Sequence, residues 1–234
     1  MGHAGFPETQ PSLVRDVLAS DDVARARGRE ALAAAYWRPV HAYLCYRWQV
    51  DTEEARDVTQ DFFAQAFARD LFAQYDPARA RLRTWVRLCV DSHARNTFKA
   101  GGRLKRGGTT EFVSVDTPGL ALPSTDGDVE AWFEREWLRG LFEEALADLA
   151  RECERLGKSV PLAVFRAADV DAGRERPGYA ELATRFGIAV TQVTNHLHWC
   201  RRRLRGHVLD RLRAQCRTEE EFVAEAQAVF GVKP

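Results

Sequence analysis

The chain has 234 residues, of which 45% are hydrophobic and 29% charged. This composition is typical of a folded protein of one or two domains rather than of a disordered or membrane-embedded chain. No stretch is apolar over the about 20 residues that a membrane-spanning helix needs, and the N-terminus lacks a secretory pattern. The five cysteines are scattered without a CxxC spacing. We therefore expect a cytoplasmic protein with reduced thiols and no membrane insertion.

The formal net charge of zero is made up of large blocks of opposite sign. Residues 79–106 carry +8, residues 107–155 carry −8 and residues 195–217 carry +6. Basic blocks of this size favour contact with phosphates. Because the first two blocks are adjacent, we expect the acidic block to lie across the basic one in the free protein and to compete with phosphates for its arginines. The alternative is that the acidic side chains only solvate their own helices.

The first hundred residues predict a three-helix unit. Apolar residues recur at helical spacing from Leu32 to Leu44, and Pro39 predicts a kink or break there. A second helix is expected from about Thr52, its predicted N-cap, to about Arg69. A third helix, from about Ala80 to Phe98, follows a turn. Its core residues are expected to be Leu82, Trp85, Val86 and Cys89, with Trp85 in the core rather than stacked on a base. Its basic residues, expected on one polar face at multiples of four, are Arg83, Arg87, Arg95 and Lys99.

The rest of the chain predicts a linker and further helices. Residues 101–128 are rich in Gly, Pro, Ser, Thr and Asp without helical periodicity. An apolar stripe from Val129 to Leu149 and a start signal at Pro161 predict new helices, and Thr218 with Glu221 forms a capping-box pattern ahead of a short final helix. We predict an all-α fold without a sheet. The expected divisions are a first domain over 1–100, a linker over 101–128, a helix-turn-helix domain over 129–217 and a helical tail over 218–234.

The segment from Tyr179 to His198 fits a helix-turn-helix. Ala183 is the small residue expected where the two helices cross, and Gly187 is the glycine expected in the turn. Polar side chains on the second helix can reach base edges, and the arginines beyond them suit phosphates. These residues are Thr191, Gln192, Thr194, Asn195 and His198, followed by Arg201, Arg202, Arg203 and Arg205. The alternative is an ordinary helical hairpin with a basic end.

Four further motifs occur in a recognisable order. They are Tyr36–Leu44, Glu54–Phe63, Tyr75–Trp85 and His196–Leu204. With the helix-turn-helix, they make the chain from about Leu13 to Phe230 resemble a bacterial RNA polymerase sigma factor of the extracytoplasmic-function type, a family with two helical domains joined by a linker. The resemblance implies a specificity subunit without catalysis of its own. It implies that the chain binds core RNA polymerase and directs sequence-specific promoter recognition and transcription initiation.

The resemblance also implies roles for individual residues. Asp57, Gln60 and Asp61 are the residues that would dock on the clamp helices of the polymerase's largest subunit. Without the resemblance, these residues would be interpreted as an ordinary solvated face. The residues that would open and hold the minus-ten element are Asp76, Arg79, Arg81, Arg83, Arg87, Arg95 and Lys99. The residues that would bind the minus-thirty-five element are Thr191, Gln192, Thr194, Asn195, His198, Arg201, Arg202 and Arg203. The implied partners are core RNA polymerase and promoter DNA, and an anti-sigma or other regulatory protein is a further candidate.

No enzymatic, metal or cofactor site is expected. Residues 102–109 nearly match the phosphate-binding GxxxxGK[ST] motif, but Gly108 occupies the lysine position and no strand precedes the loop. On a helix only His196 and Cys200 share a face, and two ligands do not make a closed zinc site. No GxSxG or HExxH motif is present. Two rival functions stay open: a stand-alone helix-turn-helix regulator and a phosphate-handling enzyme that uses the 102–109 loop.

Overall fold

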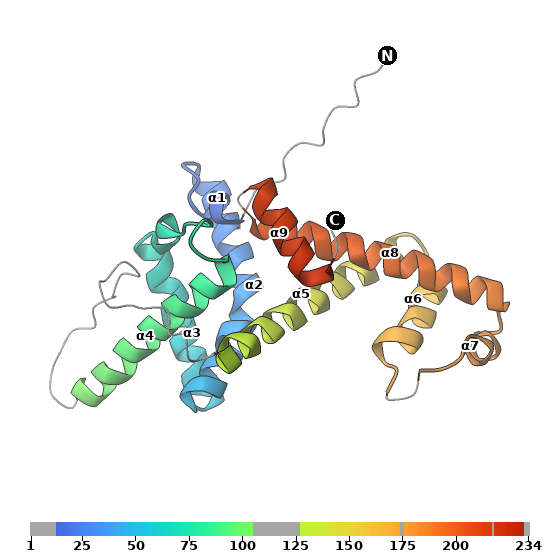
Figure 1. Ribbon diagram of the computed structural model, residues 1–234, viewed down its shortest axis with the longest axis horizontal. Coiled ribbons are helices and arrows are strands. Elements are labelled where there is room, and N and C mark those ends of the chain that lie inside the picture. Colours follow the sequence, from blue (N-terminus) through green and yellow to red (C-terminus); the bar gives the residue numbers. More distant parts are fainter. Residues whose placement is uncertain (1–12, 105–126, 174–175, 217, 232–234) are drawn as a thin grey trace, which may run out of the picture. The chain divides into compact units, whose positions relative to one another are not determined.

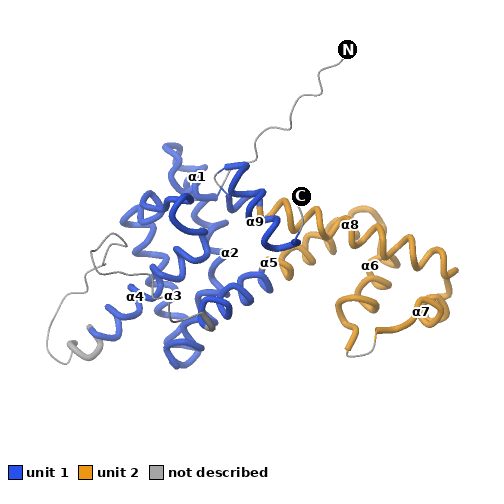
Figure 2. The backbone as a smooth tube through the Cα atoms, in the orientation of Figure 1, with its two compact units in different colours: residues 1–140, 213–234 blue, residues 141–212 orange. Residues whose placement is uncertain are grey.

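The computed structural model describes residues 13–104, 127–173, 176–216 and 218–231 (Figure 1). Every regular element within these ranges is a helix, so the predicted all-α class is confirmed. The chain divides into two compact units, one made of residues 1–140 and 213–234 and the other of residues 141–212 (Figure 2). None of the helices in the described ranges combines the length and the apolar character needed to cross a membrane.

Unit 1 contains most of the helices. They are α1 (Leu13–Val17), α2 (Asp22–Trp48), α3 (Thr52–Ala68), the 3-10 helix η1 (Leu71–Gln74), α4 (Leu82–Leu104), the start of α5 (Gly127–Arg155), the end of α8 (Val190–Gln215) and α9 (Glu219–Phe230). Pro39 lies buried inside α2, which continues through it, so the predicted break is absent. The N-cap of α3 is Asp51 rather than Thr52, because the Asp51 carboxylate accepts a hydrogen bond of 2.9 Å from the Glu54 backbone N–H.

An aromatic chain forms much of the core of unit 1. The rings of Trp37 and Phe63 stack with centroids 6.0 Å apart, and Phe67 lies 5.7 Å from Phe72. Phe72 in turn lies 5.5 Å from Trp85, which is only 5% exposed. Aromatic pairs at these separations add stabilisation beyond the burial of their area. The prediction that Trp85 belongs to the core is confirmed.

Helix α1 packs closely against α2 at Gly28. A Cβ atom at this position would clash with the backbone of Asp16 and Val17. Val14 and Val17 of α1 are buried, as is Leu32 one turn beyond Gly28. The missing side chain therefore allows the two backbones to approach and lets α1 cover this end of the core.

Unit 2 contains the remainder of α5 and α8 together with α6 (Ser159–Phe165), the π-helical turn η2 (Arg166–Val170) and α7 (Tyr179–Phe186). Helices α7 and α8 are joined by a turn in which Gly187 has a φ of +63°. The predicted helix, glycine turn and helix are thus confirmed. Glycine suits this turn because it adopts a positive φ without strain. The buried residues around the turn, all contributed by α7 and α8, are Leu182, Ala183, Val193, Leu197 and Cys200.

The compact units differ from the expected domain boundaries. Residues 129–140, expected in the second domain, belong to unit 1, because Phe133 packs edge-on against Tyr43 with centroids 5.4 Å apart. The tail also belongs to unit 1, since the Tyr75 hydroxyl donates a hydrogen bond of 2.6 Å to Glu221. Most of the expected linker lies outside the described residues, and its first four residues form the end of α4.

Candidate functional site

The predicted polymerase-binding residues lie on one exposed face of α3. Asp57, Gln60 and Asp61 are all exposed, whereas Val58 and Phe62 are buried on the opposite side. The 3.6-residue helical period separates these two sets, as the sequence predicted. We call Asp57, Gln60 and Asp61 the acidic face of α3.

Asp61 is held in place by two neighbouring side chains. Its carboxylate accepts a hydrogen bond of 2.8 Å from Gln65 and lies 3.2 Å from Nε2 of His93. The His93 side chain is buried, and this burial lowers its pKa while the Asp61 carboxylate partly opposes the shift. The half-exposed Asp61 carboxylate is therefore in contact with one buried and one partly exposed side chain.

The predicted open basic face of α4 is wrong for Arg83 and Arg87, because both side chains are buried and paired. Arg83 donates to Glu225 and, at 2.6 Å, to Glu134. Arg87 donates to Asp91 at 3.0 Å and lies 3.5 Å from Glu130. These carboxylates compensate the cost of burying the two guanidinium groups.

The burial of α4 explains the error. Every residue from Leu82 to Ala94 except Thr84 is buried, so this part of the helix has no solvated polar face. Arg83 and Arg87 lie within it. Arg95 and Lys99 lie beyond it and are exposed to solvent.

The remaining predicted minus-ten residues are accessible. Asp76, Arg79, Arg81, Arg95 and Lys99 are all exposed. The Asp76 carboxylate accepts a hydrogen bond of 2.9 Å from the Ala78 backbone N–H and so stabilises its own turn. Arg81 is half exposed and lies 3.6 Å from Glu134 and 3.5 Å from Glu225. Every described basic group near the start of α4 therefore has acidic neighbours or faces solvent.

Helix α8 presents a continuous polar face to solvent. Its exposed members recur three or four residues apart, and Val193, Leu197 and Cys200 are buried on the opposite side. The exposed members are Thr191, Thr194, Asn195, His198 and Arg202. We call this set the polar face of α8. It contains hydroxyl, amide and imidazole groups suited to base edges, with an arginine at the end suited to a phosphate.

Three other predicted reading residues already have partners within the chain. The Gln192 amide oxygen accepts a hydrogen bond of 2.9 Å from the Ala189 backbone N–H, as in half of a capping box. Arg201 donates two hydrogen bonds to Asp169, at 2.7 and 3.0 Å. Arg203 makes a similar pair with Glu152, at 2.9 and 2.5 Å. These forked pairs tie α8 to its own unit.

Glu152 is the centre of a small charged network. Hydrogen bonds from Arg203 lower the pKa of Glu152 below its ordinary value of 4.5, and His207 at 2.9 Å adds to this effect although burial opposes it. The sequence did not predict Glu152 as a partner of Arg203, because 51 residues separate the two.

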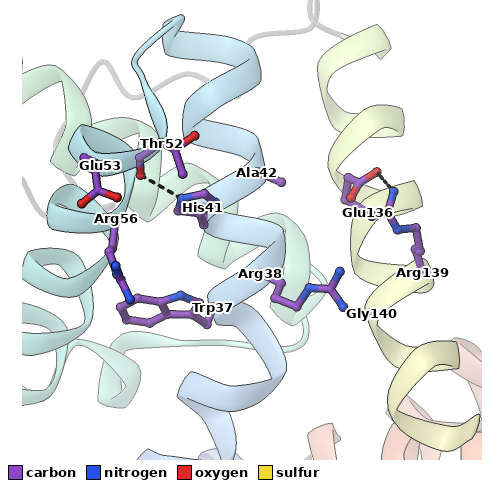
Figure 3. Close-up of a pocket in the computed structure, with 10 residues that line it drawn as sticks. All are labelled: Trp37, Arg38, His41, Ala42, Thr52, Glu53, Arg56, Glu136, Arg139 and Gly140. Atoms are coloured by element: carbon purple, nitrogen blue, oxygen red, sulfur yellow. Dashed lines mark hydrogen bonds and ion pairs between the residues drawn. The ribbon is translucent and has the colours of Figure 1, made fainter. Parts of the chain in front are cut away.

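A surface cavity of about 320 Å³ in unit 1 lies between α2, α3 and α5. Figure 3 shows Arg38 extending from α2 towards Gly140 of α5, and Arg139 paired with Glu136 at 3.5 Å. No predicted site residue lines this cavity. Its arginines are accompanied by glutamates, so its charge does not select one class of ligand. Within the described residues no group of three potential metal ligands occurs.

Comparisons of the chain with protein-family models, with curated proteins and with solved structures found no match. The function is therefore inferred from the acidic face of α3, the polar face of α8 and the arginines of α4.

Proposed function

We propose that this chain is a sigma factor of the extracytoplasmic-function type, which binds core RNA polymerase and directs it to promoters. The observation that carries the proposal is the polar face of α8, which follows a glycine turn in a helix-turn-helix arrangement. Such a helix enters the major groove with side chains near its start directed at bases. The minus-thirty-five element is its proposed target.

A second observation favours a polymerase subunit over a simple DNA-binding protein. The acidic face of α3 is exposed, and its carboxylates are therefore accessible to a partner. One of its members, Asp61, is oriented by buried His93, as expected for a group that meets a partner in a defined geometry. We assign this face to core polymerase, and the exposed Asp76, Arg79, Arg81, Arg95 and Lys99 to the minus-ten element.

The alternative is a stand-alone helix-turn-helix regulator. Burial of Arg83 and Arg87 favours it, because these two arginines are paired within unit 1 and are not free to contact promoter DNA. Such a regulator needs no acidic face on α3. The two functions therefore differ in whether unit 1 has affinity for core polymerase.

The test replaces Asp57, Gln60 and Asp61 together by alanine and measures affinity for purified core polymerase. Exposed substitutions of this kind change stability by about 0.5 kcal/mol or less, so the helical fold is expected to persist. The matched control is Glu53→Ala with Glu54→Ala, which removes two exposed carboxylates from the first turn of the same helix. The proposal predicts a large loss of affinity for the triple variant alone. Unchanged affinity of the triple variant contradicts it.

A further inference from the structure

Three arginines at the start of α4 form one cluster whose cations face carboxylates from other helices. We call Arg81, Arg83 and Arg87 the arginine cluster. Glu134 of α5 and Glu225 of α9 each lie within salt-bridge distance of both Arg81 and Arg83. The Arg83 and Glu225 side chains are 5% and 8% exposed, so α9 covers a buried part of the cluster.

The cluster also borders open space. A cavity of about 230 Å³ is lined by all three arginines together with Thr84, Phe133, Glu130 and Glu134. The Arg87 side chain is 4% exposed, and its Nε atom is buried without a hydrogen-bond partner among the described residues. A buried guanidinium N–H without a partner is costly. The Nε of Arg87 is therefore a donor that the carboxylates around the cluster leave unused.

Helix α9 is held over the cluster by two buried apolar side chains and by polar contacts. Its 12 residues, Glu219–Phe230, follow the N-cap Thr218, whose hydroxyl accepts a hydrogen bond of 3.2 Å from Glu221 N–H. Phe222 and Ala226 are its buried apolar anchors, and the Glu221 carboxylate accepts a hydrogen bond of 2.6 Å from the Tyr75 hydroxyl. A helix of this length is marginal in water by itself. Its position therefore depends on the apolar anchors, on the bond to Tyr75 and on the ion pairs of Glu225.

We propose that α9 is a displaceable cover of the arginine cluster and that the phosphates of single-stranded nucleic acid displace it. The proposal rests on the proposed function, because it assigns the covered arginines to the strand that a sigma factor holds at the minus-ten element. A phosphate offers the same charge and the same acceptor oxygens to an arginine fork as a carboxylate does, so it can replace Glu225 and Glu134 without leaving Arg83 unpaired.

The cover also lowers the positive charge that unit 1 presents near the start of α4. While α9 is in place, the Glu225 carboxylate neutralises buried Arg83. When α9 is displaced, Arg83 loses this partner and becomes available to a phosphate. Nucleic-acid binding is thereby coupled to release of the C-terminal helix.

The experiment uses the full chain without polymerase and measures its affinity for a fluorescent single-stranded DNA oligonucleotide over a salt series. The test variant is Glu225→Gln. The matched control is Glu220→Gln, which makes the same change of net charge on the same helix at an exposed first-turn position. Because Glu225→Gln removes the main ion pair of the cover, we expect at least fivefold tighter binding at low salt. We expect a salt slope steeper by about 0.7 for each additional phosphate contact.

Hydrogen exchange of the α9 amides provides a second measurement on the unaltered protein. Saturating single-stranded DNA is expected to increase their exchange, since displaced α9 loses its packing. Equal affinities of Glu225→Gln and Glu220→Gln, or α9 exchange that DNA leaves unchanged, would overturn the proposal. Failure of the chain to support transcription with core polymerase would refute the sigma-factor function without altering either result.

Discussion

Replacement of Arg83 by alanine tests whether this residue is a structural cation rather than an open DNA contact. The wild-type guanidinium lies between Glu134 and Glu225 and 4.6 Å from the centre of the Trp137 ring. Its removal leaves the buried Glu225 carboxylate with only Arg81, at 3.5 Å. Breaking a buried ion pair from one side costs about 3 to 5 kcal/mol. With a urea dependence of about 2 kcal/mol/M, the unfolding midpoint should fall by about 1.5 to 2.5 M.

The assay is urea unfolding followed by circular dichroism and tryptophan fluorescence. The control is Arg95→Ala on the same helix, which is exposed and should change stability by about 0.5 kcal/mol or less. The double variant Arg83→Met with Glu225→Leu should recover most of the loss, because an apolar pair of similar volume can replace a buried ion pair. Equal midpoints for Arg83→Ala and Arg95→Ala would refute the assignment of Arg83 to the core.

Three further predictions concern unit 2. Asn195→Ala should alter base preference at one promoter position by about 1 to 3 kcal/mol. Arg202→Ala should weaken binding to all DNA sequences alike and flatten the salt dependence of binding by about 0.9. Competition binding separates these outcomes, and identical effects of the two changes would contradict the division of roles. Arg203→Ala should reduce the loss of stability below about pH 4.5, because it removes the main cause of the lowered pKa of Glu152, whose stabilising effect disappears as the pH falls through that pKa. Melting temperatures over a pH series test this, and parallel curves for the variant and the wild type would argue against it. Gly187→Ala should cost about 1 kcal/mol by forcing a side chain to a φ of +63°, and an unchanged melting temperature would show that the turn tolerates a Cβ atom.

Features set by local sequence were predictable. The glycine turn at Gly187, the N-cap at Thr218 and the core position of Trp85 each depend on residues within one or two helical turns. Apolar periodicity likewise predicted which side of α3 is buried. The boundaries of these elements could therefore be placed within a few residues from spacing alone.

Features set by distant partners were not predictable in the same way. Arg83 is separated from Glu225 by 142 residues, and no local pattern distinguishes an arginine that faces solvent from one that a remote carboxylate neutralises. The adjacent charge blocks did indicate that acidic residues would meet the arginines, and Glu130 and Glu134 do so. Glu225, which pairs with Arg83, lies in the C-terminal tail. The four glutamates of that tail predicted a capped helix and gave no sign of this ion pair.

Transcription by purified core polymerase tests the central claim most directly. The wild-type chain is added to core enzyme with fragmented genomic DNA of the organism that encodes it, and transcript start sites are mapped. A sigma factor should give initiation at a discrete set of sites that share an upstream sequence. These starts should be lost when Asp57 and Asp61 of the acidic face are both changed to alanine. Initiation no different from that of core polymerase alone would contradict the central claim.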